Sequence, residues 1–270
     1  MDTINRIFGI INEGIGAILA PFLPGWVVAA IMALLAIAAV ILFMTVVVMS
    51  QTLAERRVLA RMQDRWGPNR VGKWGSLQPV ADVLKLMLKE DIRPVTADPV
   101  MHLLAPAITL MPALLVYAVI PFGQGMAVAD INVGLLFLLA VATLPTIGIV
   151  VAGWSSGNKY SVLGGMRAAA QMISFEVPLV LALISPILIV GSLSMTQIVE
   201  AQSGWFGLRW LVLAQPVAFV IYLIAGVAEA NRTPFDLPEA ESELGAGFWT
   251  EYSGMKFALF YLAEYLNAFA

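Results

Sequence analysis

Residues Trp26–Met49 read WVVAAIMALLAIAAVILFMTVVVM, a run of 24 residues without one charged side chain. The hydrocarbon core of a bilayer is about 30 Å thick, and an α-helix needs about 20 apolar residues to cross it. The run is too long for the apolar core of a signal peptide, and no small-residue cleavage site follows it. This stretch therefore predicts a transmembrane helix.

The composition of the whole chain also indicates a membrane protein. Of its 270 residues, 60% are hydrophobic and 12% are charged, whereas soluble domains carry about 25% charged residues. The formal net charge of −3 excludes a basic nucleic-acid binder. Because the chain has no cysteine and one histidine, it cannot itself hold an iron–sulfur cluster, a thiolate zinc site or a bis-histidine haem. Any electron chemistry must take place on a partner or on a diffusible ligand.

Further apolar stretches follow the first one. A last stretch starts at Phe257 and reaches Ala270, which as a helix is about 21 Å long and too short for a full crossing. We therefore predict an all-α integral membrane protein, a single polytopic domain over residues 1–270, with five complete transmembrane helices and the start of a sixth. The four stretches predicted to cross after the first are 103–121, 131–154, 172–193 and 210–228.

Lysine and arginine are distributed unevenly between the two predicted sides. The loops after the first, third and fifth spans hold 13 of the 15, and the other side holds Arg6 and Arg209. Positive charge collects in cytoplasmic loops, so we expect the N-terminus to lie outside. No Arg- and Ser-rich mitochondrial presequence is visible, so a bacterial inner membrane is the simplest location.

Residues 50–102 form a predicted cytoplasmic loop that contains a short helix at about 79–90. Its apolar residues follow the i, i+3, i+4, i+7, i+8 pattern of one helix face, and Asp82, Lys85 and Lys89 lie opposite. Such a helix is typical of the membrane interface. Two interpretations stay open: a topology anchor that contacts lipid headgroups, or a lipid-facing gate for an amphipathic ligand. The apolar positions are Val80, Val83, Leu84, Met87 and Leu88.

Two glutamates, Glu176 and Glu264, fall within predicted spans. A carboxylate at the bilayer centre costs on the order of 2.5–3.5 kcal/mol on insertion scales, and such residues usually face a bundle interior or water. Each is either a hydrogen-bonded structural acid or part of an ion path. Residues 229–256 form a predicted acidic cytoplasmic loop between these spans. The preference of acidic side chains for a helix N-terminus would explain some of its acids. Together the acids would form a chain from the cytoplasm to mid-membrane and titrate as a group.

Six short motifs match one known family. The chain resembles the H subunit (subunit 1 in mitochondria) of respiratory complex I, the proton-pumping NADH:quinone oxidoreductase, and the resemblance covers nearly its whole length. Within the fourth motif, the PFDLPEAE run is highly specific for this family and its relatives. The motifs are ERR at 55–57, GPNRVG at 67–72, QPVAD at 78–82, RTPFDLPEAE at 232–241, EYS at 251–253 and AEY at 263–265.

The resemblance implies a membrane subunit that joins the membrane arm to the peripheral arm and supplies the quinone entrance and much of the quinone tunnel. Quinone is then its substrate, while NADH, FMN and iron–sulfur clusters belong to partner subunits, and the chain alone has no activity. Its implied partners are the peripheral quinone-site subunits, small membrane subunits and the lipid bilayer. The implied tunnel residues are Glu55, Arg56, Arg65, Asp82 and Lys85.

The resemblance also implies an acidic path that couples quinone chemistry to proton pumping. Arg232 and Asp236 would belong to a mobile loop within this path. The implied path residues are Glu176, Glu229, Arg232, Asp236, Glu239, Glu241, Glu243, Glu251 and Glu264.

Two features depart from the family pattern. The family has eight spans, so we expect this sequence to be truncated and to lack the rest of the sixth span and two more. Phe175 stands where many relatives have tyrosine before the buried glutamate, so we expect no proton relay through a hydroxyl at this position, while Glu176 is present.

Two rival functions stay open. The membrane anchor of an energy-converting nickel–iron hydrogenase would share the acidic path without needing quinone, but residues 55–72 favour complex I. A stand-alone ion transporter would show inverted repeats and broken helices, and we find neither pattern in the sequence.

Overall fold

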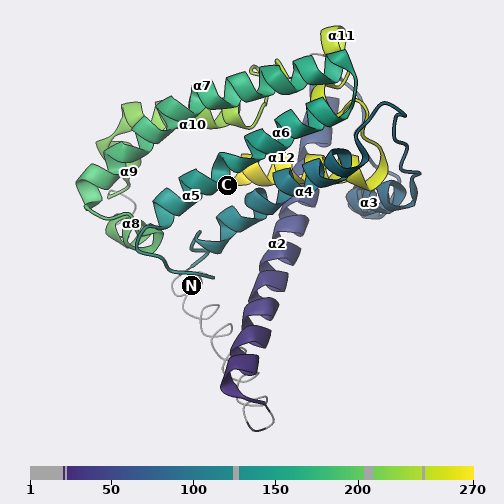
Figure 1. The fold of residues 1–270 in the computed structure, drawn as a ribbon. Helices are drawn as coiled ribbons and strands as arrows, with labels where there is room; N and C mark the ends of the chain where they lie inside the picture. The colour runs from purple at the N-terminus through teal and green to yellow at the C-terminus, as the bar shows by residue number, and fades with distance from the viewer. Residues whose placement is uncertain (1–20, 22, 124–127, 204–208, 239–240) are drawn as a thin grey trace.

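The computed structural model describes residues 21, 23–123, 128–203, 209–238 and 241–270, except for the side chains of residues 241 and 242. These residues form only helices and connecting loops (Figure 1), which confirms the predicted all-α membrane class. Four helical segments in this part are long and apolar enough to cross a bilayer. They are α2 (Gly25–Met62), α4 (Pro99–Leu115) with η2 (Val116–Ala118), α5 (Gly134–Ala142) with α6 (Leu144–Ser155), and α7 (Lys159–Val190).

Helix α2 is longer than predicted. It continues through residues 50–62, which the hydropathy pattern places in a loop, and it ends before Asp64, whose φ is +54°. Residues 51–62 contain neither Gly nor Pro and are mostly good helix formers, so nothing in them stops the helix. At 1.5 Å per residue, α2 is about 57 Å long. Its last turns therefore hold Glu55 and Arg56 on a rigid helix.

Helix α3 (Gln78–Leu88) confirms the helix predicted at about 79–90. Pro79 lies in its first turn, where a missing N–H costs nothing, and the helix ends where Lys89 becomes extended. Its apolar face is exposed, with Leu84 at 54% and Leu88 at 87% exposure. The position of α3 in the membrane interface stays a prediction.

Helix α7 begins thirteen residues before the predicted span. Asn158 caps its N-terminus by accepting a hydrogen bond from the Tyr160 amide at 3.0 Å, and this cap fixes the start at Lys159. The predicted span over 172–193 covers only the more apolar C-terminal part of this helix, which ends at Val190.

The predicted span over 210–228 is interrupted. It divides into α9 (Leu211–Ala214) and α10 (Pro216–Glu229), with Gln215 at φ −136° and ψ 61° between them. Proline disfavours the helical conformation for the residue before it, so Pro216 explains the break. Because α10 has 14 residues, the count of five complete spans stays a prediction.

Helix α12 (Gly254–Phe269) lies in the middle of the bundle beside α4, while α7 and α10 run side by side and the N-terminal part of α2 stands apart (Figure 1). One buried cluster joins α4, α6, α7 and α12 around Phe248 and Phe260. A second joins α2, α4 and α12, where the buried Tyr117 hydroxyl donates to the Leu266 carbonyl at 2.6 Å. The other helices in the described part of the chain are α8 (Met195–Gln202), α11 (Glu241–Leu244), η1 (Lys73–Gly75) and η4 (Gly247–Trp249).

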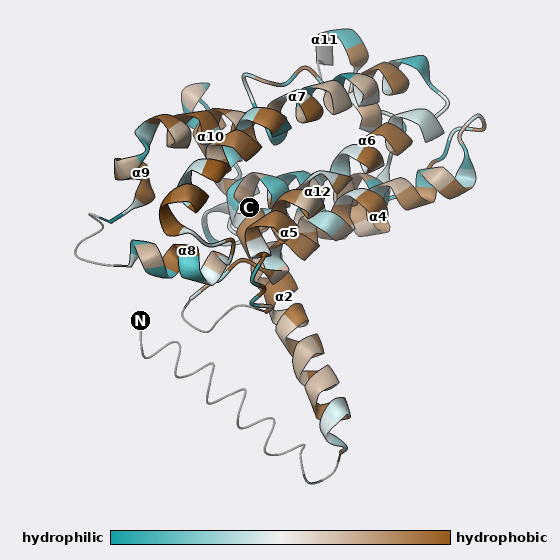
Figure 2. Ribbon diagram, turned by 60° about the vertical axis from the view of Figure 1, so that its left-hand side comes forward, coloured by the Kyte–Doolittle hydropathy of each residue, from teal (hydrophilic) through white to brown (hydrophobic). Residues whose placement is uncertain are grey.

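Helices α2 and α10 consist largely of hydrophobic residues, as the colours of Figure 2 show. Leu42 on α2 and Leu188 on α7 are 67% and 79% exposed. A soluble protein rarely exposes such large apolar patches, so this surface fits contact with lipid or with other membrane subunits.

The loops after the first, third and fifth predicted spans meet on one side. The Asp98 amide donates to the Ser155 carbonyl at 3.0 Å, and the Asn158 side chain donates to Glu251 at 2.7 Å. At the opposite end, the Leu135 amide donates to the Leu193 carbonyl at 2.9 Å. Which side faces the cytoplasm stays a prediction, and Arg6 lies outside the described residues.

Candidate functional site

Arg232, just after α10, lies between carboxylates from two other helices. Its Nη1 is 3.3 Å from Glu55 Oε1 on α2, and its Nη2 is 3.1 Å from Glu264 Oε1 on α12. The guanidinium also lies 4.2 Å from the ring centroid of Tyr265. We name Glu55, Arg232, Tyr261, Glu264 and Tyr265 the Arg232 cluster. It joins α2, α12 and the segment after α10 at one point.

Two tyrosines of α12 complete this cluster. The Tyr265 hydroxyl donates to Glu55 Oε2, and the Tyr261 and Tyr265 hydroxyls are 2.8 Å apart. Neither tyrosine is among the residues predicted for the site. Their spacing of four residues, which places them on one helix face, and the position of Tyr265 directly after Glu264 are the signals available in the sequence.

The cluster holds one guanidinium against two carboxylates. Burial alone would lower the pKa of Arg232, but the charge of Glu264, the contact with Tyr265 and the charge of Glu55 together raise it. Arg232 therefore stays protonated. With both carboxylates ionised, the three charged side chains of the cluster carry a formal net charge of −1.

A second ion pair ties α2 to α3. Arg56 Nη1 is 2.5 Å from Asp82 Oδ2, and the Lys85 Nζ is 3.7 Å from Asp82 Oδ1. Gln78 also donates to Asp82 Oδ1 at 3.2 Å. Arg56 follows Glu55 directly in α2. Two neighbouring residues of one helix therefore make the two contacts: Arg56 contacts α3, and Glu55 contacts Arg232.

The attachment of α3 is expected to weaken at low pH. Partial burial would raise the pKa of Asp82, but hydrogen bonds from Arg56 and Gln78 and the charges of Arg56 and Lys85 lower it overall. A lowered pKa means that the ion pair stabilises the structure fully above the ordinary Asp pKa of about 3.9 and is lost as the pH falls through the lowered value. A spin label on a Leu88→Cys variant should therefore stay restrained at neutral pH and gain mobility only in strong acid.

Replacing Asp82 by asparagine should make the same spin label mobile at neutral pH as well. Lys85→Met is the matched control: Lys85 is 67% exposed, and exposed pairs contribute at most about 1 kcal/mol, so the label should stay restrained. Equal mobility in all three backgrounds would show that the pair does not hold α3.

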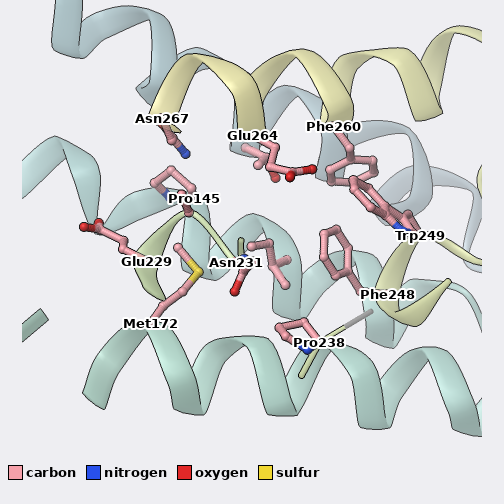
Figure 3. A pocket seen from close by; sticks show the side chains of 13 residues that line it. Pro145, Met172, Glu229, Asn231, Pro238, Phe248, Trp249, Phe260, Glu264 and Asn267 are labelled. Atoms are coloured by element: carbon pink, nitrogen blue, oxygen red, sulfur yellow. The ribbon is translucent and has the colours of Figure 1, made fainter. Parts of the chain in front are cut away.

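A small cavity of about 30 Å³ lies between α12 and α7 (Figure 3). The polar side chains around it include Thr109, Glu229, Asn231, Glu264 and Asn267. A water molecule occupies about 30 Å³ in the liquid and needs two to four polar partners. The cavity therefore has the size and the lining to hold water between Glu229 and Glu264.

A larger cavity of about 380 Å³ adjoins the first, and Glu229 and Asn267 line both. Its wall also includes Glu176 and Arg232, among mainly apolar residues of α5, α7 and α10. This volume has room for on the order of ten water molecules. The two cavities thus link Glu176, Glu229 and Glu264, and Glu264 contacts Arg232.

Three predicted site residues have partners elsewhere. Arg65 donates to Gln63 at 2.7 Å on the exposed loop after α2. Glu243 pairs with Arg167 at 2.8 Å, with both side chains well exposed. Glu251 accepts from Asn158, as described above, so these residues lie outside the Arg232 cluster.

The remaining predicted residues lie in the segment after Arg232. Asp236 is half-buried there. Glu239 and the side chain of Glu241 lie outside the described residues, so their predicted roles stay predictions.

Comparison with known proteins identifies the family. A family profile described as NADH dehydrogenase matches residues 35–270. The H subunit of NADH-quinone oxidoreductase from Geobacillus sp. (strain WCH70) is 56% identical over 219 residues, which are 81% of this chain and 65% of that protein. The protein of the same name from Geobacillus kaustophilus (strain HTA426) is 53% identical over 251 residues, 92% of this chain and 73% of that protein.

A third relative with this name, from Anoxybacillus flavithermus (strain DSM 21510 / WK1), is 58% identical over 219 residues, again 81% of this chain and 65% of that protein. The chain thus spans about two-thirds of the length of these curated relatives. The profile and the relatives agree with each other and with the motifs at 55–82 and 232–265. The chain therefore belongs to the NADH dehydrogenase family, together with the H subunits of NADH-quinone oxidoreductases.

Proposed function

We propose that this chain is the membrane subunit in which an NADH:quinone oxidoreductase admits quinone and couples its reduction to proton translocation. The observation that carries the proposal is the adjacency of Glu55 and Arg56 on α2. Arg56 contacts α3, and Glu55 contacts Arg232. A change of charge at the α2–α3 junction therefore acts directly on the Arg232 cluster.

The quinone entrance in this proposal is the α2–α3 junction. The exposed apolar face of α3 offers a path for an isoprenoid tail from the lipid, and Arg56, Asp82 and Lys85 offer hydrogen-bond donors and acceptors for the head group. Glu55, next to Arg56 in α2, supports this site through its contact with Arg232. Arg65, on the loop after α2, would line the quinone tunnel.

In this proposal, proton uptake by quinone couples its reduction to proton translocation. Reduction of quinone to quinol takes two electrons and two protons, and the electrons come from NADH through FMN and iron–sulfur clusters on partner subunits. Proton uptake beside Arg56 changes the electrostatic potential at Glu55. Because Arg232 contacts both Glu55 and Glu264, the change also alters the electrostatic potential at Glu264. Water in the two cavities then connects Glu264 to Glu229 and Glu176.

The acidic segment after Arg232 supplies protons to this path. Its predicted position in a cytoplasmic loop suits exchange with water, and the chain would lie in a bacterial inner membrane with its N-terminus outside. Its partners would be the peripheral quinone-site subunits and small membrane subunits. The residues of this segment are Asp236, Glu239, Glu241, Glu243 and Glu251.

Photolabelling of the assembled complex tests the quinone assignment. A photoreactive quinone with an isoprenoid tail should label residues 50–90, and excess unlabelled quinone should remove that label. The matched control is a probe with the same tail and no quinone ring, whose label should resist competition. Absence of competed label from residues 50–90 would contradict the proposal and favour a hydrogenase anchor, which needs no quinone.

A further inference from the structure

Gln171 on α7 contacts the segment that carries Arg232 at three places. The residue is 8% exposed, and the two N–H groups of its Nε2 are shared among three acceptors: the carbonyls of Ala228 and Phe235, both at 2.8 Å, and Asn231 Oδ1 at 3.0 Å. Backbone carbonyls only accept hydrogen bonds, so the amide nitrogen must face this segment. One side chain therefore holds both ends of the turn around Arg232.

The backbone that Gln171 holds has an unusual conformation. Asn231 has φ +50°, a region that residues with side chains seldom adopt and that asparagine tolerates better than most. The Arg232 amide donates to the Val227 carbonyl, and the Phe235 amide donates to the Arg232 carbonyl. Gln171 thus fixes a tight turn on both sides of the residue that bridges Glu55 and Glu264.

The side-chain oxygen of Gln171 differs from its nitrogen in its hydrogen bonding. Its Oε1 is buried, and none of the described residues gives it a hydrogen-bond donor. An unsatisfied buried acceptor destabilises a protein, and an apolar side chain of similar size would avoid this cost. The hydrogen bonds that Nε2 donates therefore explain a glutamine at this position, whereas packing does not.

We propose that Gln171 is a positioning residue for coupling: its carboxamide holds segment 228–235 so that Arg232 stays between Glu55 and Glu264 while the charge of the cluster changes. This inference rests on the proposed function. Gln171 acts through Arg232 and needs no contact with quinone.

Substitution of Gln171 by glutamate should make the function of this residue depend on pH. Gln171→Glu keeps the shape of the side chain, but when ionised it places oxygens against three oxygen acceptors. When protonated, it regains one O–H donor, so its function should recover as the pH falls. Gln171→Met has no donor at any pH and should not recover. The charged and titratable residues on α7, on α10 and in the segment from Arg232 to Glu243 are the same in all variants. They are Lys159, Tyr160, Arg167, Glu176, Tyr222, Glu229, Arg232, Asp236, Glu239, Glu241 and Glu243.

The test uses the assembled complex in inverted membrane vesicles, with proton pumping and quinone reduction measured across pH. Gln171→Met should lower pumping about tenfold at every pH, and Gln171→Glu should do so only at high pH. Hydrogen exchange in 228–235 should be faster in Gln171→Met and unchanged in α4. Asn231→Gly keeps the positive φ and removes one of the three acceptors, so its loss should be smaller.

Wild-type pumping and exchange in both Gln171 variants would overturn this inference, and so would equal losses in both variants without pH dependence. Reduction of an artificial acceptor by NADH, measured in the same membrane vesicles, normalises each variant to the amount of NADH-oxidising complex bound to the membrane. Glu264→Gln, measured in parallel, separates the two proposals. If Glu264→Gln also pumps normally, the proposed function fails; if only the Gln171 variants behave as wild type, this inference alone fails.

Discussion

The Arg232→Met variant should lose quinone-linked proton pumping by roughly 10- to 100-fold. Removing one partner of a buried ion pair costs about 3–5 kcal/mol. The 31% exposure of Arg232 reduces that cost to about 1–3 kcal/mol, and each 1.36 kcal/mol is tenfold in rate. Without the guanidinium, the cluster loses the positive charge that contacts both Glu55 and Glu264, so the proposed connection between the two carboxylates is lost. Pumping in vesicles, normalised to NADH oxidation with an artificial acceptor, measures the loss.

Two further variants show whether the loss comes from the position of the charge. Arg167→Met also removes a guanidinium from an ion pair, but Arg167 and Glu243 are 44% and 61% exposed, so pumping should stay near the wild-type rate. Arg232→Lys keeps the charge without the planar fork that reaches two carboxylates and should give an intermediate rate. Equal losses in Arg232→Met and Arg167→Met would contradict the role of the cluster.

The Glu176→Gln variant should lose pumping while NADH oxidation by artificial acceptors continues. Glu176 lines the larger cavity with Glu229, and an amide of the same shape cannot carry a proton along this path. A positioned proton-transfer group contributes about 10²–10⁴-fold to a rate, so a loss of at least about a hundredfold is expected. The readout is the number of protons moved per NADH oxidised.

The control for this variant is Glu200→Gln, which neutralises an exposed glutamate on α8. Glu200 is not among the residues that line either cavity, so its replacement should leave the proton yield unchanged. A normal proton yield in Glu176→Gln would remove Glu176 from the path.

The long apolar helices could be predicted from the sequence because hydropathy accumulates over some 20 residues. The 24 uncharged residues from Trp26 identify α2 in this way, and the amphipathic period identifies α3. The ends of helices depend on single residues instead. The continuation of α2 past Met49 and the break at Gln215 were therefore missed, although Pro216 was visible.

Glu176 and Glu264 could be predicted individually, since charged residues are rare in membrane spans, whereas Glu55 is named only by the family resemblance. Their partners could not. Glu55 meets Arg232 across 177 positions and Tyr265 across 210, and no local pattern in the sequence encodes contacts at such separations. For the same reason Gln171 was missed, because an isolated glutamine in a helix gives no sign that three acceptors converge on it.

Infrared difference spectroscopy of the complex with quinone oxidised and then reduced tests the central claim most directly. If quinone reduction changes the protonation of the carboxylates in this chain, the difference spectrum will contain carboxylic-acid C=O bands, and one of them will be missing in Glu176→Gln and retained in Glu200→Gln. A spectrum without such bands, or one that is the same in both variants, would contradict the account.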